Sequence, residues 1–382
     1  MHLFIYLKTN QKGFTLLELL IAMAIGAIVM LAAYNVFISQ QKSHKLQSEL
    51  VDAEQNARAA LDLLTREMRL AGAGVQRAIL TADVAAGAST LTVVSSTGFV
   101  GGEIINIVTA GTTGTSEAVN LADAFNPADP YTTLTLNSTT PAVNTYTIST
   151  SDVSIFKEKI TAATENSITF RAPITTKETV LYRGAAGGNS VLFVSNQTNT
   201  NFESQTGTTP IFIDDGGGKF ENPSVAVNGG SANCTCTGCS NGDCDTLTLT
   251  GNLINSYSIG SKVNTGVDAI TYAFDSVNDQ ITRNTQPFVE NIDYFQIKYY
   301  DGSNNPIPNP APSPYYGVTL TATERSKIRK VNIQIVAISS KDDTSHTETG
   351  TYEDGTTYAN RGSTNRRRIF LESDILMANM AP

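Results

Sequence analysis

The feature that most constrains this chain is an uninterrupted apolar stretch near its N-terminus, residues 14–38. Glu18 is its one charged residue, and the twenty residues after Glu18 are uncharged and mostly apolar. Twenty helical residues are about 30 Å long, which is enough for one passage through the hydrocarbon core of a bilayer. The stretch is too long for a secretory signal peptide, and the small residue Gly13 precedes it where a cleavage site should follow. These residues predict a helix that spans a membrane once.

Glu18 is unusual in such a helix. A carboxylate at the centre of a bilayer costs about 2.5–3.5 kcal/mol, and less near the interface. Because Glu18 lies only four residues past Phe14, one interpretation is an interfacial residue without a special role. The other is a carboxylate that pairs with a positive group. A cut before Phe14 would create such a group, the new α-amino group of a neighbouring subunit.

The residues around this position form a motif, Lys12-Gly13-Phe14-Thr15-Leu16-Leu17-Glu18. It resembles the processing site of type IV prepilins and the related pseudopilins, and the resemblance covers residues 8 to about 40. It implies that residues 1–13 are a leader, that a prepilin peptidase cleaves between Gly13 and Phe14, and that the amine of Phe14 is methylated. It also implies that Glu18 pairs with the N-terminus of a neighbouring subunit during assembly.

Past the membrane stretch, residues 39–72 continue as an amphipathic helix. Apolar residues recur at steps of three and four, at Leu46, Leu50, Ala53, Ala57, Leu61, Leu64, Met68 and Ala71. Gly72 and Gly74 then predict the end of one helix over 14–72, roughly 87 Å long. Its second half is expected to pack on the β-rich part of this chain, with a free-standing coiled coil as the alternative. Residues 65–72 resemble the end of this helix in PilW-type minor pilins.

Residues 80–265 form a region rich in Thr, Gly, Ser and Asn, which we interpret as a large β insertion. Alternating runs predict strands at 90–95, 103–108, 133–136, 152–157, 167–171, 190–195 and 246–250. The segment 133–148 is similar in sequence to 246–259, and 90–95 is similar to 190–195. We call each of these internal similarities a sequence echo. Two related modules or chance similarity in a Thr-rich sequence both account for these echoes.

Residues 266–382 predict a β-sheet, with strands at 269–274, 280–283, 292–299, 328–339 and 367–376. Their order and spacing resemble the C-terminal sheet of PilW-type proteins. The fold class expected is therefore α+β: a long N-terminal helix packed on a β-rich, mostly antiparallel head of pilin type. The basic run 366–368 is expected to be a solvated end of this sheet.

All four cysteines fall within eleven residues, at Cys234, Cys236, Cys239 and Cys244. Outside the cytoplasm they favour two disulfides within an exposed loop. Their C-x-C-x2-C-x4-C spacing also suits a tetrahedral zinc site, and free or intermolecular thiols are the third possibility. The sequence does not choose among the three disulfide connectivities.

The composition disfavours several functional classes. The net charge is −9, which argues against a nucleic-acid partner because such proteins carry a basic face. Three histidines and scattered acidic loops offer no metal site, and no phosphate loop, nucleophile elbow or zinc-protease motif occurs. We therefore expect a protein that is not an enzyme and has no cofactor.

The resemblance implies a minor pilin that takes part in type IV pilus assembly or initiation. Its precursor would sit in the inner membrane with the head outside the cytoplasm and would later enter the pilus at the cell surface. The implied partners are the major pilin, other minor pilins, the prepilin peptidase, the inner-membrane assembly platform and, before assembly, membrane lipid. The alternatives are a J-type minor pseudopilin of type II secretion and a pilus-tip adhesin or DNA-binding subunit.

Overall fold

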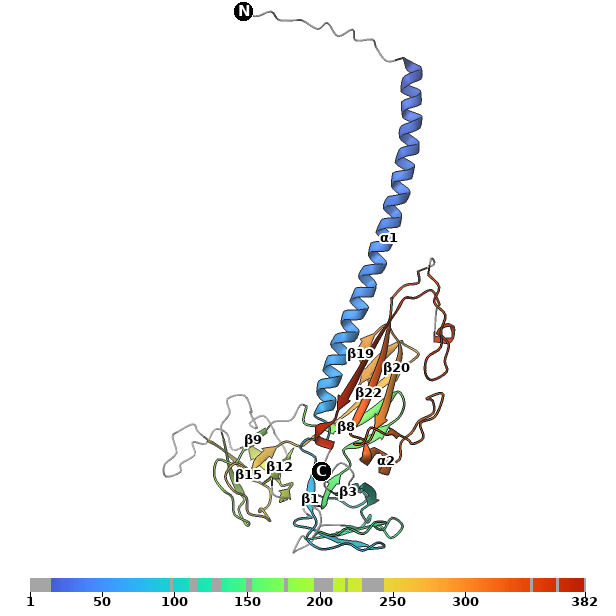
Figure 1. The fold of residues 1–382 in the computed structure, drawn as a ribbon. Coiled ribbons are helices and arrows are strands. Elements are labelled where there is room, and N and C mark those ends of the chain that lie inside the picture. The colour runs from blue at the N-terminus through green and yellow to red at the C-terminus, as the bar shows by residue number, and fades with distance from the viewer. Residues whose placement is uncertain are drawn as a thin grey trace, which may run out of the picture.

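The computed structural model describes residues 15–96, 99–109, 116–125, 132–148, 153–174, 178–195, 209–216, 219–228, 244–343, 346–361 and 364–380. One long helix, α1 (Leu16–Arg69), runs from a free apolar end into a β-rich head (Figure 1). The strand pairs of the head are antiparallel, which confirms the expected α+β class.

The second half of α1 packs on the head, as the apolar spacing predicts. Its buried face begins at Ala53 and continues through Ala57, Leu64 and Met68. The helix ends three residues before the predicted limit, because Leu70 caps it and Gly72 turns the chain with φ +81°. A Cβ at Gly72 would lie 2.8 Å from the carbonyl oxygen of Asn379, so this turn requires glycine.

The main head consists of two antiparallel sheets. The first has the order β19-β18-β17-β8-β7, and the second has the order β21-β20-β22-β23. A six-residue helix and two 3-10 helices complete this part. The elements are β7 (Ile160–Ala163), β8 (Ser167–Ala172), β17 (Asp268–Asp275), β18 (Gln280–Arg283), β19 (Gln286–Glu290), β20 (Ile292–Tyr300), β21 (Pro306–Ile307), α2 (Ala322–Lys327), β22 (Lys330–Ile338), η2 (Tyr358–Arg361), β23 (Arg368–Leu376) and η3 (Ala378–Met380).

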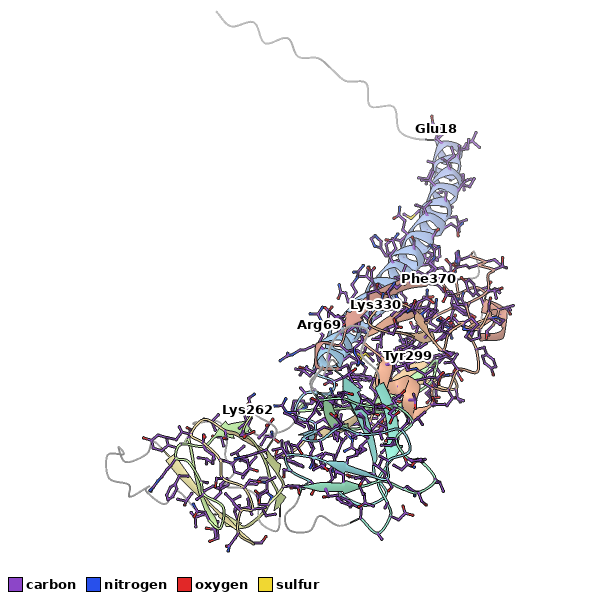
Figure 2. The ribbon with its side chains drawn as sticks, turned by 60° about the horizontal axis from the view of Figure 1, so that its bottom comes forward. Glu18, Arg69, Lys262, Tyr299, Lys330 and Phe370 are labelled. Atoms are coloured by element: carbon purple, nitrogen blue, oxygen red, sulfur yellow. The ribbon has the colours of Figure 1, made fainter. Side chains whose placement is uncertain are left out.

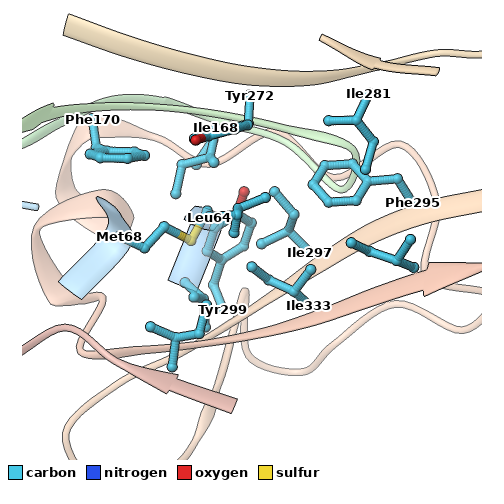
Figure 3. Close-up of a cluster of buried hydrophobic side chains, with 14 of the residues drawn as sticks. Leu64, Met68, Ile168, Phe170, Tyr272, Ile281, Phe295, Ile297, Tyr299 and Ile333 are labelled. Carbon is cyan, nitrogen blue, oxygen red and sulfur yellow. The ribbon is translucent and has the colours of Figure 1, made fainter. Parts of the chain in front are cut away.

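The main core lies where α1 meets the two sheets. Leu64 and Met68 of α1 are fully buried in one cluster with Phe170 and Tyr272 of the first sheet and Ile333 of the second (Figure 3). Fully burying an apolar side chain of this size contributes about 1.5–3 kcal/mol. This contact fixes the direction in which the rest of the helix leaves the head.

Two smaller β-modules lie at the end of the head away from the apolar half of α1 (Figure 1). Each has its own hydrophobic core. The first contains β1 (Arg77–Ile79), β2 (Thr90–Thr92), β3 (Ile104–Thr109), β4 (Ser116–Asn120), β5 (Thr133–Thr135) and β6 (Val153–Lys157). The second contains β9 (Glu178–Val180), β10 (Val191–Ser195), β11 (Thr209–Pro210), β12 (Phe212–Asp214), β13 (Phe220–Glu221), β14 (Ser224–Asn228), β15 (Cys244–Leu249) and β16 (Lys262–Asn264).

The two modules share a topology. The first has a sheet of order β1-β6-β3-β4 and a β2–β5 pair, and the second has a sheet of order β9-β16-β12-β13 and a corresponding β10–β15 pair. In the second module β14 and β11 extend that pair to four strands. The isolated bridges correspond too: Leu80↔Val93 and Val84↔Tyr146 in the first module match Leu181↔Val194 and Ala185↔Tyr257 in the second.

A buried carboxylate occupies the same place in both modules. In the first, Glu117 Oε2 accepts hydrogen bonds from the backbone nitrogen and side-chain nitrogen of Asn144, at 3.0 and 2.6 Å. In the second, Glu221 Oε2 accepts the same pair from Asn255, at 3.0 and 3.5 Å. Asn144 and Asn255 are equivalent residues of the sequence echo. The shared topology and the shared bonds favour duplication over chance.

The range 80–265 includes two strands of the main head. β7 and β8 pair with each other, and β8 pairs with β17, so residues 160–172 belong to the first sheet and to the main core. We propose that the insertion is two modules, at residues 75–157 and 178–264, which flank this shared hairpin. Arg325 of α2 forms a buried ion pair, at 2.5 Å, with Glu158, the residue that directly follows the first module.

Candidate assembly site on the N-terminal helix

The N-terminal end of α1 is organised by Thr15 and Glu18. The Thr15 hydroxyl accepts a hydrogen bond from the backbone nitrogen of Glu18 at 3.2 Å, and Glu18 Oε2 accepts one from the backbone nitrogen of Thr15 at 2.9 Å. This reciprocal arrangement is a capping box, which satisfies free amides at a helix start. The spacing Thr15-x-x-Glu18 is the sequence signal that predicts this cap.

Capping leaves Glu18 able to bind a second group. A carboxylate has two oxygens and about four acceptor sites, and the cap bonds from Thr15 use Oε2. Glu18 is also exposed and far from the head in Figure 2. An amine of another molecule can therefore reach it without disturbing the head.

The surface around Glu18 is apolar on every side of the helix. The N-terminal part of α1 has a mean hydropathy of 2.5 in its most apolar window and is long enough to cross a membrane. Its large side chains are exposed, from Leu16 at 77% to Phe37 at 55%. A helix that is apolar all round is stable only when lipid or other helices cover it.

The opposite end of α1 is locked to the head by a buried carboxylate. Glu67 accepts two hydrogen bonds from the guanidinium of Arg283 in β18, at 2.9 and 3.0 Å, and one from the Tyr272 hydroxyl in β17, at 2.7 Å. Burial and the neighbouring carboxylate raise the pKa of Tyr272, which keeps it a donor. The apolar end is therefore held at a fixed position relative to the sheets.

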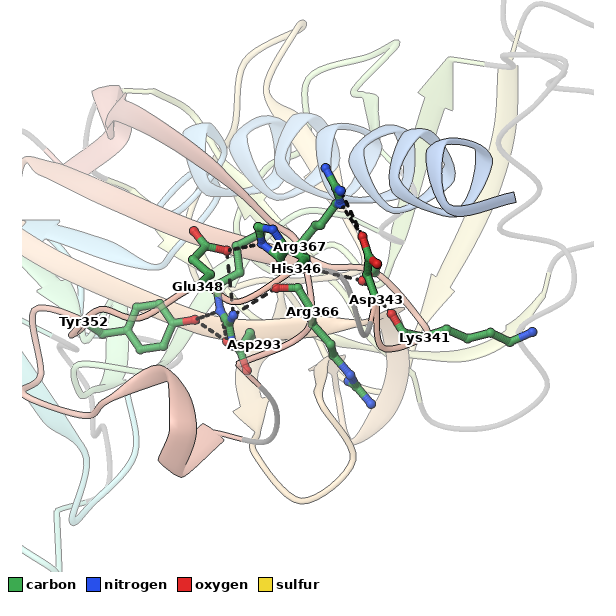
Figure 4. A network of polar contacts seen from close by, with 10 residues as sticks. Asp293, Lys341, Asp343, His346, Glu348, Tyr352, Arg366 and Arg367 are labelled. Carbon is green, nitrogen blue, oxygen red and sulfur yellow. Dashed lines mark hydrogen bonds and ion pairs between the residues drawn. The ribbon is translucent and has the colours of Figure 1, made fainter. Parts of the chain in front are cut away.

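The basic run 366–368 is a solvated sheet end only in part, because the Arg367 side chain is 46% exposed but the Arg368 side chain is buried. The Arg368 side chain is 0% exposed and pairs with Asp293 at 2.7 Å, and Tyr352 donates a short hydrogen bond to the same carboxylate (Figure 4). Arg366 and Arg367 contact Asp342 and Asp343, at 3.3 and 2.9 Å. This network ties the loop after β22 to the start of β23 and leaves no free basic patch among these three residues.

Of the remaining predicted site residues, the described part of the chain includes Cys244 alone. Gly13, Phe14, Cys234, Cys236 and Cys239 lie outside the described residues. Cys244 begins β15, opposite Ser195 on β10. Cleavage, methylation and cysteine pairing therefore stay predictions.

Residues 8–34 match the family described as prokaryotic N-terminal methylation motif. The chain carries a type IV prepilin-like methylation motif. The motif implies a protein of the type IV pilin or pseudopilin kind, a class of structural proteins that the prepilin peptidase processes and that assemble with other pilus components. The motif and the apolar helix together fit a precursor anchored in the inner membrane. A search of the curated proteins finds no match to the chain.

Proposed function

We propose that this chain is a PilW-type minor pilin that takes part in the assembly or initiation of a type IV pilus. The precursor is anchored in the inner membrane by α1, is cut between Gly13 and Phe14, and is methylated on the amine of Phe14. The helix then leaves the lipid and packs among the helices of neighbouring subunits. The head remains outside.

The observation that carries this proposal is the exposed apolar end of α1, with Glu18 at its start. The same surface that lipid covers in the precursor can be covered by other helices in a filament, so one segment serves both states. Within such a bundle a lone carboxylate is costly, and pairing with the α-amino group of a neighbour offsets that cost.

The two β-modules support a minor subunit over a major one. They lie at the end of the head farthest from the apolar end of α1 and have cores of their own. A subunit with this added bulk is accommodated more easily at a few positions, such as a filament tip, than at every position of a tightly packed filament.

Deletion of the gene and a count of surface pili by electron microscopy test the proposal. Piliation should be lost or strongly reduced and should return when the wild-type gene is supplied. Mass spectrometry of sheared pili should detect the chain starting at Phe14. Normal piliation together with loss of protein secretion would contradict the pilus assignment and support a J-type pseudopilin.

A further inference from the structure

Lysines from two distant parts of the chain meet beside α1, just past its apolar segment. Lys42 and Lys45 of α1 and Lys341 of the loop after β22 line one hollow of about 680 Å³. The hydroxyl-bearing residues Ser39 and Ser43 line it as well. Lys42 and Lys45 lie one helical turn apart, and both are exposed.

The charges in this hollow are unbalanced. Glu49 lies 3.7 Å from Lys341, Asp343 pairs with Arg367, and Asp342 shares Arg366 with Asp279. The cations of the lining, Lys42, Lys45, Lys341 and Arg367, therefore outnumber its three carboxylates by one. The neighbouring Lys341 ammonium lowers the pKa of Lys45, as expected for like charges held close together. An anion between them would relieve this repulsion.

The hollow also lies at the depth of a lipid headgroup. If the uncharged residues 19–38 span the hydrocarbon core, Lys42 lies about 6 Å and Lys45 about 10 Å beyond its edge at 1.5 Å per residue. The headgroup layer is roughly 5–7 Å thick on each side. Helical side chains tilt toward the N-terminus, which here is the membrane, so both ammonium groups can reach this layer.

From this geometry we infer that Lys42, Lys45 and Lys341 bind the phosphate of an anionic phospholipid in the precursor. The acyl chains of that lipid lie along the apolar part of α1, and Ser39 and Ser43 supply hydroxyl donors. Because Lys341 belongs to the head, the bound lipid holds the head against the membrane surface. The inference rests on the proposed membrane-anchored precursor and names the lipid that it binds.

The test uses the full chain in lipid nanodiscs of phosphatidylcholine with a minor fraction of phosphatidylglycerol. Native mass spectrometry measures which lipid stays bound after release from the disc. The wild-type chain should retain phosphatidylglycerol in preference to phosphatidylcholine. This preference should fall roughly five-fold in the single variant Lys45→Gln. It should fall by roughly a further five-fold in the double variant that also carries Lys341→Gln. Lys262→Gln is the matched control, since this exposed lysine lies on the second module, far from the Glu18 end of α1 (Figure 2). This variant should retain the wild-type preference.

Equal retention of the two lipids by the wild-type chain, or an unchanged preference in the double variant, would overturn the inference. Displacement of phosphatidylglycerol by added inorganic phosphate would also overturn it, because the ligand would then be free phosphate. If the double variant does not fold, Lys42→Gln on the exposed helix face should still show the five-fold loss.

A wild-type chain that enters pili but shows no lipid preference refutes this inference alone. A chain that binds the lipid but never enters pili refutes the proposed function alone.

Discussion

Glu67 and Arg283 form a bidentate ion pair across 216 residues of sequence, and this pair joins the long helix to β18. The Glu67 side chain is 7% exposed, and Tyr272 donates to the same carboxylate. Removal of Glu67 leaves the partly buried Arg283 guanidinium and the buried Tyr272 hydroxyl without their acceptor, and breaking a buried pair in this way costs up to about 3–5 kcal/mol.

We therefore predict that Glu67→Ala lowers the free energy of unfolding of the head by about that amount. Urea unfolding of the detergent-solubilised chain measures it. Glu54→Ala is the control, because the Glu54–Arg58 pair is exposed and such pairs contribute about 0–1 kcal/mol. Similar losses in the two variants would show that the Glu67 pair does not anchor the helix.

Processing should depend on Gly13. Gly13→Leu should block cleavage, so that the chain keeps its first thirteen residues, whereas filament-associated wild-type protein should begin at Phe14. Gly26→Ala is the control within the same helix, since a Cβ at Gly26 meets nothing within 4 Å, and it should be cut normally. N-terminal sequencing distinguishes these results, and a wild-type filament protein that begins at Met1 would contradict the prediction.

Glu18→Ala should lower incorporation into filaments about tenfold or more, because the amine of a neighbour loses its carboxylate partner. Thr15→Ala separates this role from helix capping. It breaks the capping box at a cost of about 1 kcal/mol but keeps the carboxylate, so incorporation should stay within about twofold of wild type. Quantitative immunoblots of sheared pili measure both variants. Equal losses would indicate that Glu18 acts through the cap.

Cys234, Cys236, Cys239 and Cys244 should form two disulfides in the exported protein, because thiols are oxidised outside the cytoplasm. Intact-mass analysis should show a gain of about 4 Da on reduction, one hydrogen for each sulfur. No gain, together with stoichiometric zinc that a chelator removes, would support the metal site instead.

The stability of the head should rise with pH because of Lys159. Burial, with the nearby Arg329 and Arg77, lowers the pKa of Lys159 to about 7, and its ammonium donates to the carbonyl of Asn379 at 2.9 Å. The ordinary value is 10.5, so between pH 7 and 10.5 the unfolded chain binds more protons than the folded one. The free energy of unfolding therefore increases across this window, by a few kcal/mol in order of magnitude.

Lys159→Met should remove this increase, and unfolding at several pH values compares the two chains. The difference in the free energy of unfolding between wild type and variant, followed across pH, separates the effect of Lys159 from that of other groups that titrate in the same range. An identical pH dependence in both chains would show that Lys159 is not the source.

Local pattern predicted much of the fold. The strand expected at 280–283 is β18, and the apolar steps along residues 53–71 mark the buried face of α1. Long-range pairing was not predictable in this way. β8 joins β17 about a hundred residues later, and Arg368 is buried because Asp293 neutralises it from another strand. The burial of Glu67 was not predictable from the apolar spacing of α1, because Glu67 is charged. Its partner Arg283 lies too far along the chain for any local pattern to connect the two.

The separate cores of the two modules divide the head into parts that can vary independently. Each module has its own core and a buried glutamate in an equivalent position, Glu117 or Glu221, while α1 packs on other strands. Substitutions on the outer surfaces of the modules therefore leave the contacts of α1 with the head untouched. Such variation can accumulate in two similar modules while the residues that hold α1 to the head stay constrained.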